Sequence, residues 1–255
     1  MLALLFLLQA TGAVAADAPP PADIHFIGQY SFTWAGLALA KAELAIDKTR
    51  DKYALKLQVR LAGIVNLFTS HRSITTVEGS HEGESYHPHV YESHYWTKKK
   101  PRHLKVAYDA KGVMVEETVE PPEDRTERPE VPHALKDKTI DPLTLLLALG
   151  GGNLTPRVFD AKHLYDGKAV KGEQTVLRTE IGKVAAIPYD LSRTPVSGLT
   201  AKEQREYATG EPPLAFYVSA DDRHIPLYMT MPAFLGYVKG WIAKECKTWE
   251  ECSIE

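Results

Sequence analysis

The amino-acid sequence predicts a mainly β protein, built as a strongly curved antiparallel sheet with one or two short helices. Apolar side chains recur at every second position over most of the chain, which is the period of a half-buried strand. Turn signals separate these runs at short intervals, as in sandwiches, barrels and curved open sheets. Only two segments have a helical pattern. We therefore expect a half-barrel or β-spiral.

Residues 1–16 predict a signal peptide. The opening MLALLFLLQA is apolar and uncharged, but it is shorter than the ~20 residues that span a bilayer. Ala13-Val14-Ala15 is a small-residue cleavage pattern, so cleavage is expected after Ala15 or Ala16. A disordered leader at 17–23 follows. The sequence thus predicts export to the periplasm of a cell envelope, and not an integral membrane protein.

Residues 24–255 are expected to form a single β domain. Alternating runs cover 24–34, 38–46 and 53–61, the last with Tyr53 and Leu55 against Lys56 and Gln58. Such alternation indicates one face packed on a core and the other in water. Hairpin signals at 109–112, 165–168 and 221–224 separate later runs. We expect about ten to thirteen strands.

Two helices are predicted. Asp141 can cap a helix that starts at Pro142, runs through the leucines of 143–149 and ends at three glycines. This helix is apolar nearly all round, so it should be buried on the concave side of the sheet. The second, Thr200 to Ala208, has Thr200 as cap and Glu203 three residues on, and it should be exposed.

Charged residues gather in two places. The Pro-rich segment 121–132, PPEDRTERPEVP, predicts a mobile loop. The basic cluster 98–102, KKKPR, could meet phosphate groups of lipid or an acidic partner. The simpler interpretation is a hairpin tip, in which lysine and proline prevent edge pairing and the acidic residues of 116–130 face the cluster.

The two cysteines, Cys246 and Cys252, lie six positions apart. In an oxidising compartment such a pair predicts a disulfide bond. The alternative is a redox-active pair, but active dithiols have C-x-x-C spacing beside a βαβ pattern.

Five histidines, His81, His87, His89, His94 and His103, fall within one short region. His87-Pro88-His89 could offer two imidazoles to zinc or copper. Alternation places His94 on the opposite face from His87 and His89, and no cysteine is near. We therefore predict no metal site and interpret these histidines as exposed polar residues at strand edges, although the sequence leaves metal binding open.

Motifs of known chemistry are incomplete. His81-Glu82 lacks the second histidine four positions on that a zinc protease needs. Gly150-Gly151-Gly152 lacks the lysine and hydroxyl of a phosphate loop. The formal net charge of −3 does not argue for nucleic acid. The sequence predicts no catalytic residue, no cofactor and no enzyme.

A series of short motifs resembles the domain-of-unknown-function family 3108, exported proteins of Gram-negative bacteria, and the resemblance covers nearly the whole mature chain. The motifs are Tyr30 with Trp34-Ala35-Gly36-Leu37-Ala38-Leu39-Ala40-Lys41-Ala42, Gly79 with Tyr86-His87-Pro88, the Asp109 turn, Asp141-Pro142-Leu143-Thr144, Asp166-Gly167-Lys168, Thr194-Pro195-Val196-Ser197-Gly198 and Arg223-His224-Ile225-Pro226-Leu227. The resemblance implies an envelope protein with no established activity. By analogy of architecture alone, the sheet is similar to lipoprotein carriers.

These observations favour a non-enzymatic periplasmic protein that maintains the envelope or binds a partner, either another envelope protein or an apolar ligand such as a lipid on the concave sheet. Residues that could line such a ligand are Phe26, Tyr30, Phe32, Trp34, Leu145 and Leu146. The alternative is an envelope hydrolase or glycan-processing enzyme with a site made of scattered carboxylates and histidines. Ordinary core packing is the simpler interpretation of the apolar residues.

Overall fold

The computed structural model describes residues 23–63, 71–97, 101–208, 212–233 and 236–254. The predicted signal peptide, nearly all of the predicted leader and Lys98 to Lys100 of the basic cluster lie outside the described residues. Within the described part, no helix has both the length and the apolar character needed to cross a membrane.

The described residues are mostly β, with one large antiparallel sheet and three short α-helices. The strands are β1 (Ile24–Trp34), β2 (Leu37–Lys48), β3 (Lys52–Leu61), β4 (His71–Glu82), β5 (Ser85–Thr97), β6 (Pro101–Tyr108), β7 (Met114–Glu120), β8 (Arg157–Phe159), β9 (Leu164–Lys171), β10 (Thr175–Thr179), β11 (Gly182–Ser197), β12 (Leu214–Ser219), β13 (Pro226–Pro232) and β14 (Tyr237–Cys246). The helices are α2 (Pro142–Ala148), α3 (Ala201–Ala208) and α4 (Trp249–Cys252), with a 3₁₀ turn, η1 (His133–Leu135). The strand count exceeds the expected range, because β8 and β10 are too short to show alternation.

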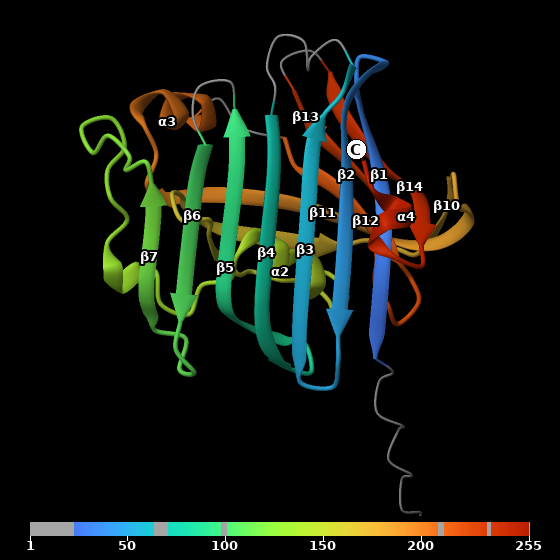
Figure 1. The fold of residues 1–255 in the computed structure, drawn as a ribbon, viewed down its shortest axis with the longest axis horizontal. Coiled ribbons are helices and arrows are strands. Elements are labelled where there is room, and N and C mark those ends of the chain that lie inside the picture. Colours follow the sequence, from blue (N-terminus) through green and yellow to red (C-terminus); the bar gives the residue numbers. More distant parts are fainter. Residues whose placement is uncertain (1–22, 64–70, 98–100, 209–211, 234–235, 255) are drawn as a thin grey trace, which may run out of the picture.

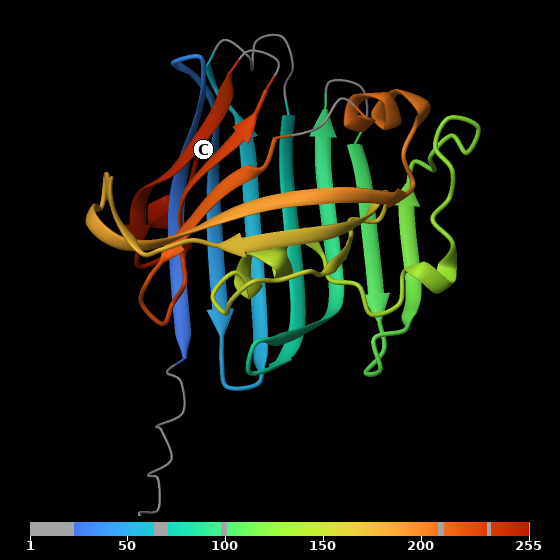
Figure 2. The same cartoon turned by 180° about the vertical axis from the view of Figure 1, so that it is seen from behind.

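The sheet is open, and its strand order is β7-β6-β5-β4-β3-β2-β1-β14-β13-β12-β11-β9-β8, with β10 attached to β11. The C-terminal strand β14 pairs with β1 and so joins the two halves of the sheet. Figure 1 shows β1 to β7 side by side, and Figure 2 shows the long strand β11 crossing the other side of this layer. The sheet curls back over its own concave face, which confirms the predicted curved architecture.

The core lies between the two halves of the sheet. Alternate residues of β1 to β3 join one large apolar cluster, and Phe26, Leu44 and Leu55 among them are at most 2% exposed. Val106 of β6 and Leu227 of β13 belong to the same cluster, although they are far apart in sequence. The period-two pattern therefore predicts the buried face correctly.

Helix α2 fills the concave side, where Figure 2 shows it between the two layers. The Asp141 carboxylate accepts hydrogen bonds from the backbone amides of Leu143 and Thr144, both at 2.9 Å, so the predicted cap is confirmed. Tyr53 of β3 reaches the hydroxyl of Thr144 at 2.9 Å. Because Leu147 is 7% exposed and joins the main core, the helix is part of the packing of the sheet.

The C-terminal segment covers the outer face of β1 and β2. Cys246 and Cys252 form the predicted disulfide, with a Cα–Cα distance of 5.7 Å. Gln29 donates to the carbonyl of Cys252 at 3.0 Å. The Glu43 side chain is fully buried on this face, although it carries a carboxyl group. Burial raises its pKa, and the amide of Ile254 and the nearby cations Lys56, Arg60 and Arg72 offset only part of that effect.

Candidate functional site

The predicted ligand-lining residues do not surround one hollow. Phe26 and Tyr30 are 1% and 7% exposed and pack in the main core, and Phe32 packs against it. No open apolar groove therefore runs along these side chains. Trp34 is partly exposed at the end of β1. Leu146 packs against both large clusters of the core. The ligand-lining role of these residues stays a prediction.

Leu145 lies elsewhere, in a small hollow of about 80 Å³ beside β9 and β11. Tyr165 and Arg193 line this hollow and also line a much larger cavity of about 630 Å³ next to it. The larger cavity lies between β9, β11 and α3 and has both apolar and charged walls. Its lining residues are Asp160, His163, Leu164, Tyr165, Arg193, Pro195, Leu199, Glu203, Glu206, Tyr207, Pro212, Pro232 and Ala233.

An aspartate–histidine pair forms one wall of the cavity. Asp160 accepts hydrogen bonds from the backbone amides of Lys162 and His163 at 2.9 and 2.7 Å, and from Nδ1 of His163 at 2.9 Å. Burial alone would raise the pKa of Asp160, but these hydrogen bonds and the charge of His163 hold it below its ordinary value. The turn before β9 thus fixes an ionised carboxylate and orients the imidazole.

Arg128 links this wall to α3. Its Nη1 lies 2.6 Å from Nε2 of His163, and its Nη1 and Nη2 reach the carboxylate of Glu203 at 3.0 and 2.8 Å. Because an arginine can only donate, this contact makes Nε2 of His163 the acceptor, while, against the lowering effect of burial, Asp160 at Nδ1 raises the pKa of the imidazole. The amide and hydroxyl of Thr200 also donate to Glu203, at 2.7 and 3.0 Å. The predicted capping box of α3 is therefore confirmed.

The same contacts hold the charged loop 121–132 against the sheet. Its Glu123 pairs with Arg102 and lies 3.2 Å from Lys162, and its Arg128 reaches α3. Arg102 of the basic cluster thus faces an acidic residue of the loop, as the simpler interpretation expects, while Lys98 to Lys100 lie outside the described residues. The predicted mobility of this loop is not tested.

The two carboxylates that contact His163, those of Asp160 and Glu203, are both held ionised. Burial would raise the pKa of Glu203, yet Arg128 and Thr200 lower it to about 2. Asp160 is also held below its ordinary range. A hydrolase with two carboxyl groups needs one of them protonated near neutral pH. The row of Asp160, His163 and Glu203 can bind a cation or a hydrogen-bond donor, but no carboxyl group in it is poised to donate a proton.

The histidine region is arranged differently from the sequence-based expectation. The register of β4 and β5 shifts at His89, because Pro88 pairs with Gly79 but Val90 pairs with Glu78. This bulge reverses the alternation. The prediction that His94 lies on the opposite face from His87 is therefore wrong, since both lie on the outer face.

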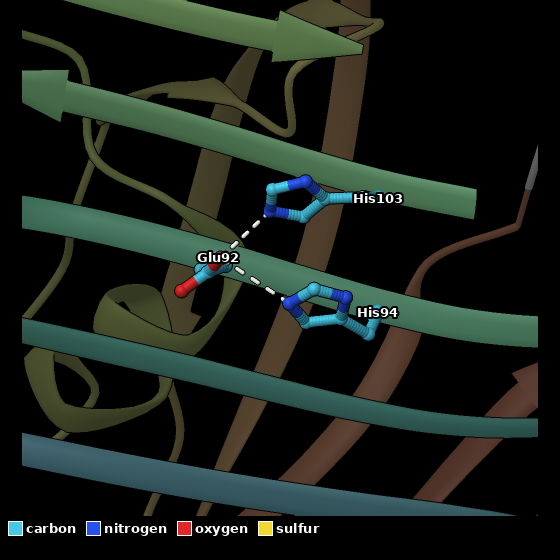
Figure 3. Close-up of side chains that lie close together, drawn as sticks. All are labelled: Glu92, His94 and His103. Carbon is cyan, nitrogen blue, oxygen red and sulfur yellow. Dashed lines mark hydrogen bonds and ion pairs between the residues drawn. The ribbon is translucent and has the colours of Figure 1, made fainter. Parts of the chain in front are cut away.

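A metal-ligating group lies on that outer face (Figure 3). His94 of β5 and His103 of β6 are directly paired across the two strands, and their rings stack with centroids 4.3 Å apart and planes within 4°. The Nε2 atoms of both rings face Oε1 of Glu92, at 3.2 Å from His94 and 2.7 Å from His103. All three ligand atoms lie within 4.8 Å of one another. His87 and His89 instead bond to Ser85 and Ser80, respectively.

Sequence reasoning named His94 and His103 but missed their pairing with Glu92. A signal was present. Antiparallel pairing of the runs before and after the basic cluster can place His94 opposite His103, and alternation puts Glu92 on the same face as His94. The network of Arg128, Asp160, His163 and Glu203 had no such signal, because its residues come from three separate segments.

The comparisons with known proteins concern family and fold. A family model described as protein of unknown function (DUF3108) matches residues 29–240. A β-barrel-like protein of the domain of unknown function DUF1849 from Brucella abortus has a TM-score of 0.53 at 13% identity, covering 87% of this chain and 95% of that one. A candidate lipoprotein from Parabacteroides distasonis has a TM-score of 0.34 at 8% identity, with the same coverage of both chains. No curated protein matches. The similarity to the Brucella protein shows the fold alone. The similarity to the Parabacteroides protein is too low to show even the fold.

Proposed function

The chain belongs to the DUF3108 family of proteins of unknown function, and we propose that it is a non-enzymatic binding protein of the cell envelope. Its ligand is an amphipathic small molecule held in the cavity between β9, β11 and α3. The observation that carries this proposal is the cavity itself, at about 630 Å³. That volume is in the range of small-molecule sites, which are mostly preformed and combine apolar walls with a few fixed polar groups.

The walls of the cavity suit such a ligand. Leu199 and Tyr165 offer apolar surface, while Asp160, His163 and Glu203 offer polar groups whose positions are fixed by mutual hydrogen bonds. A preorganised polar wall costs little further ordering when a ligand binds. The small hollow at Leu145 continues the apolar surface, so this predicted ligand-lining residue is retained in the proposal.

The ionisation states of the polar side chains that line the cavity support a binding role over a catalytic one. The pKa of Glu203 is about 2, and its charge is neutralised by Arg128. Nε2 of His163 lies 2.6 Å from the same arginine, which a substrate would have to displace to reach this nitrogen. General acid–base catalysis needs groups with a pKa near the working pH. The envelope hydrolase alternative would require this network to rearrange.

Export to the periplasm remains part of the proposal. The disulfide between Cys246 and Cys252 supports it, because disulfides persist in oxidising compartments and are rare in the cytosol. The signal-peptide pattern at 1–16 agrees with the same compartment.

The proposal is tested by extracting protein purified without detergent from its own host and analysing the extract by mass spectrometry. We expect one stoichiometric small molecule. In the variant Ala233→Trp, the indole should occupy part of the cavity and remove most of this molecule. The matched control is Val115→Trp, at a residue of β7 that is 62% exposed and does not line the cavity.

A clean extract from the unmodified protein, or full occupancy in Ala233→Trp, would contradict the proposal. Affinity capture of bound proteins would then test the alternative, in which the protein contacts another envelope protein.

A further inference from the structure

We propose that Glu92, His94 and His103 form a binding site for a divalent transition-metal ion of the zinc or copper type. This inference goes beyond the proposed function, because none of the three residues lines the cavity. Two imidazole nitrogens and one carboxylate oxygen form a donor set that zinc and copper accept.

The spacing of the donor atoms fits a tetrahedral ion. Bonds of about 2.0–2.1 Å to zinc place neighbouring ligand atoms about 3.3 Å apart. Nε2 of His94 lies 3.2 Å from Oε1 of Glu92, and Nε2 of His103 lies 2.7 Å from the same oxygen. Both rings turn Nε2 toward Glu92, but their planes are parallel, so rotation of one side chain has to bring the two Nε2 lone pairs onto a common ion (Figure 3).

The strands hold these donors in place. Glu92 and His94 are two residues apart on β5, and His103 is opposite His94 on β6, so all three project from the same face of adjacent paired strands. Trp96, next along this face, stacks with His94 at 6.2 Å between ring centroids. A site on paired strands is better positioned than one on a loop.

The surroundings favour a cation. Oε2 of Glu120 on β7 lies 4.0 Å from Nδ1 of His103, and after a small approach this carboxylate can accept a hydrogen bond from Nδ1 while Nε2 binds the metal. A carboxylate behind a ligating histidine is the usual second contact in metal sites. Lys105 stands opposite Glu92, but its ammonium group is engaged with both oxygens of Glu116, at 2.8 Å each.

Three protein ligands leave a fourth position of the tetrahedron for water or an external donor. The side chains of Glu92, His94 and His103 are 34%, 44% and 26% exposed, so this position faces solvent. The geometry is that of an exchangeable site and not of a closed structural one. The site can therefore take up and release its ion without unfolding the sheet.

The test is isothermal titration of untagged protein with zinc chloride, after removal of bound metal with a chelator. We expect one Zn²⁺ per chain. His94→Ala and His103→Ala should each weaken binding by more than ~100-fold, since each removes a ligand. Glu120→Gln should weaken it by about 10-fold, because it removes the contact behind His103.

The matched control is the double variant His87→Ala/His89→Ala, which removes two exposed histidines of the same strand and should bind zinc as the unmodified protein does. Melting temperatures in chelator should agree among the variants, which separates lost binding from lost folding. If a histidine variant does not fold, the variant Glu92→Gln is used in its place, because glutamine has nearly the same shape as glutamate but lacks the charged ligand oxygen.

A second measurement uses Cu²⁺ and electron paramagnetic resonance. The unmodified protein should show coupling to two imidazole nitrogens, and His103→Asn should show one. Absence of 1:1 zinc uptake, equal binding by His94→Ala, or loss of binding in the His87/His89 double variant would each overturn the proposal.

Discussion

The disulfide at the C-terminus offers a perturbation whose magnitude can be worked out. The change is the double variant Cys246→Ser/Cys252→Ser. The two cysteines are six positions apart, so the bond closes a loop of about seven residues, and the chain-entropy relation gives about 8 cal/mol/K. At 25 °C this corresponds to about 2.4 kcal/mol of stability. Loss of the bond should therefore lower the melting temperature by about 5–9 °C for a domain of this size.

The fold should survive this loss, because the bond only fastens the segment that covers the outer face. The main core contains neither cysteine, and Gln29 still bonds to the carbonyl of residue 252. Thermal melts followed by circular dichroism measure the effect. Reductant should lower the melting temperature of the unmodified protein by the same amount and leave the double variant unchanged. A fall of less than about 2 °C, or loss of a cooperative transition, would refute the reasoning.

Three further changes test other parts of the structure. Leu147→Asp should lower the free energy of unfolding, measured in urea, by more than about 3 kcal/mol, because it buries an unpaired charge. Leu145→Asp, at a half-buried position, should lower it clearly less. Equal losses of stability would contradict the packing of α2. Glu43→Gln should stabilise the protein at neutral pH. Burial raises the pKa of Glu43 in the folded state, so the ionised form destabilises the fold. The gain in stability from Glu43→Gln should therefore be full above that raised pKa and vanish as the pH falls below the ordinary glutamate pKa. A stability difference that does not change with pH would refute this reasoning. Glu203→Gln should destabilise the protein by about 1 kcal/mol at pH 7, because the ion pair with Arg128 is partly exposed and solvent screens it. Since the folded pKa of Glu203 is about 2, this difference should shrink between the ordinary glutamate pKa and pH 2, as denaturation at several pH values would show.

The sequence alone determined the features that depend on neighbouring residues. Alternation along β1 to β3 identified the buried face, because successive side chains of a strand point to opposite sides. Asp141 and Thr200 marked the starts of α2 and α3, because a cap acts within one turn. The cysteine spacing indicated a disulfide that closes a short loop. The order of short motifs also identified the family correctly.

Alternation also failed at one local feature. The bulge at His89 adds one residue to β5, and a one-residue shift reverses every side chain beyond it. The sequence could not show this shift, because the bulge is defined by the pairing of β5 with β4. The relation of His94 to His87 was mispredicted for this reason alone.

Only the tertiary structure decided where the binding surfaces lie. Pairing of β14 with β1 lets the second half of the sheet curl over the first, and this fills the concave side that the sequence left open for a ligand. The cavity at α3 forms instead at the rim, where Arg128 meets Glu203 across 75 positions of sequence. Such contacts follow from the path of the whole chain and leave no periodic signal, so the sequence determined the kind of sheet and the folded chain determined its sites.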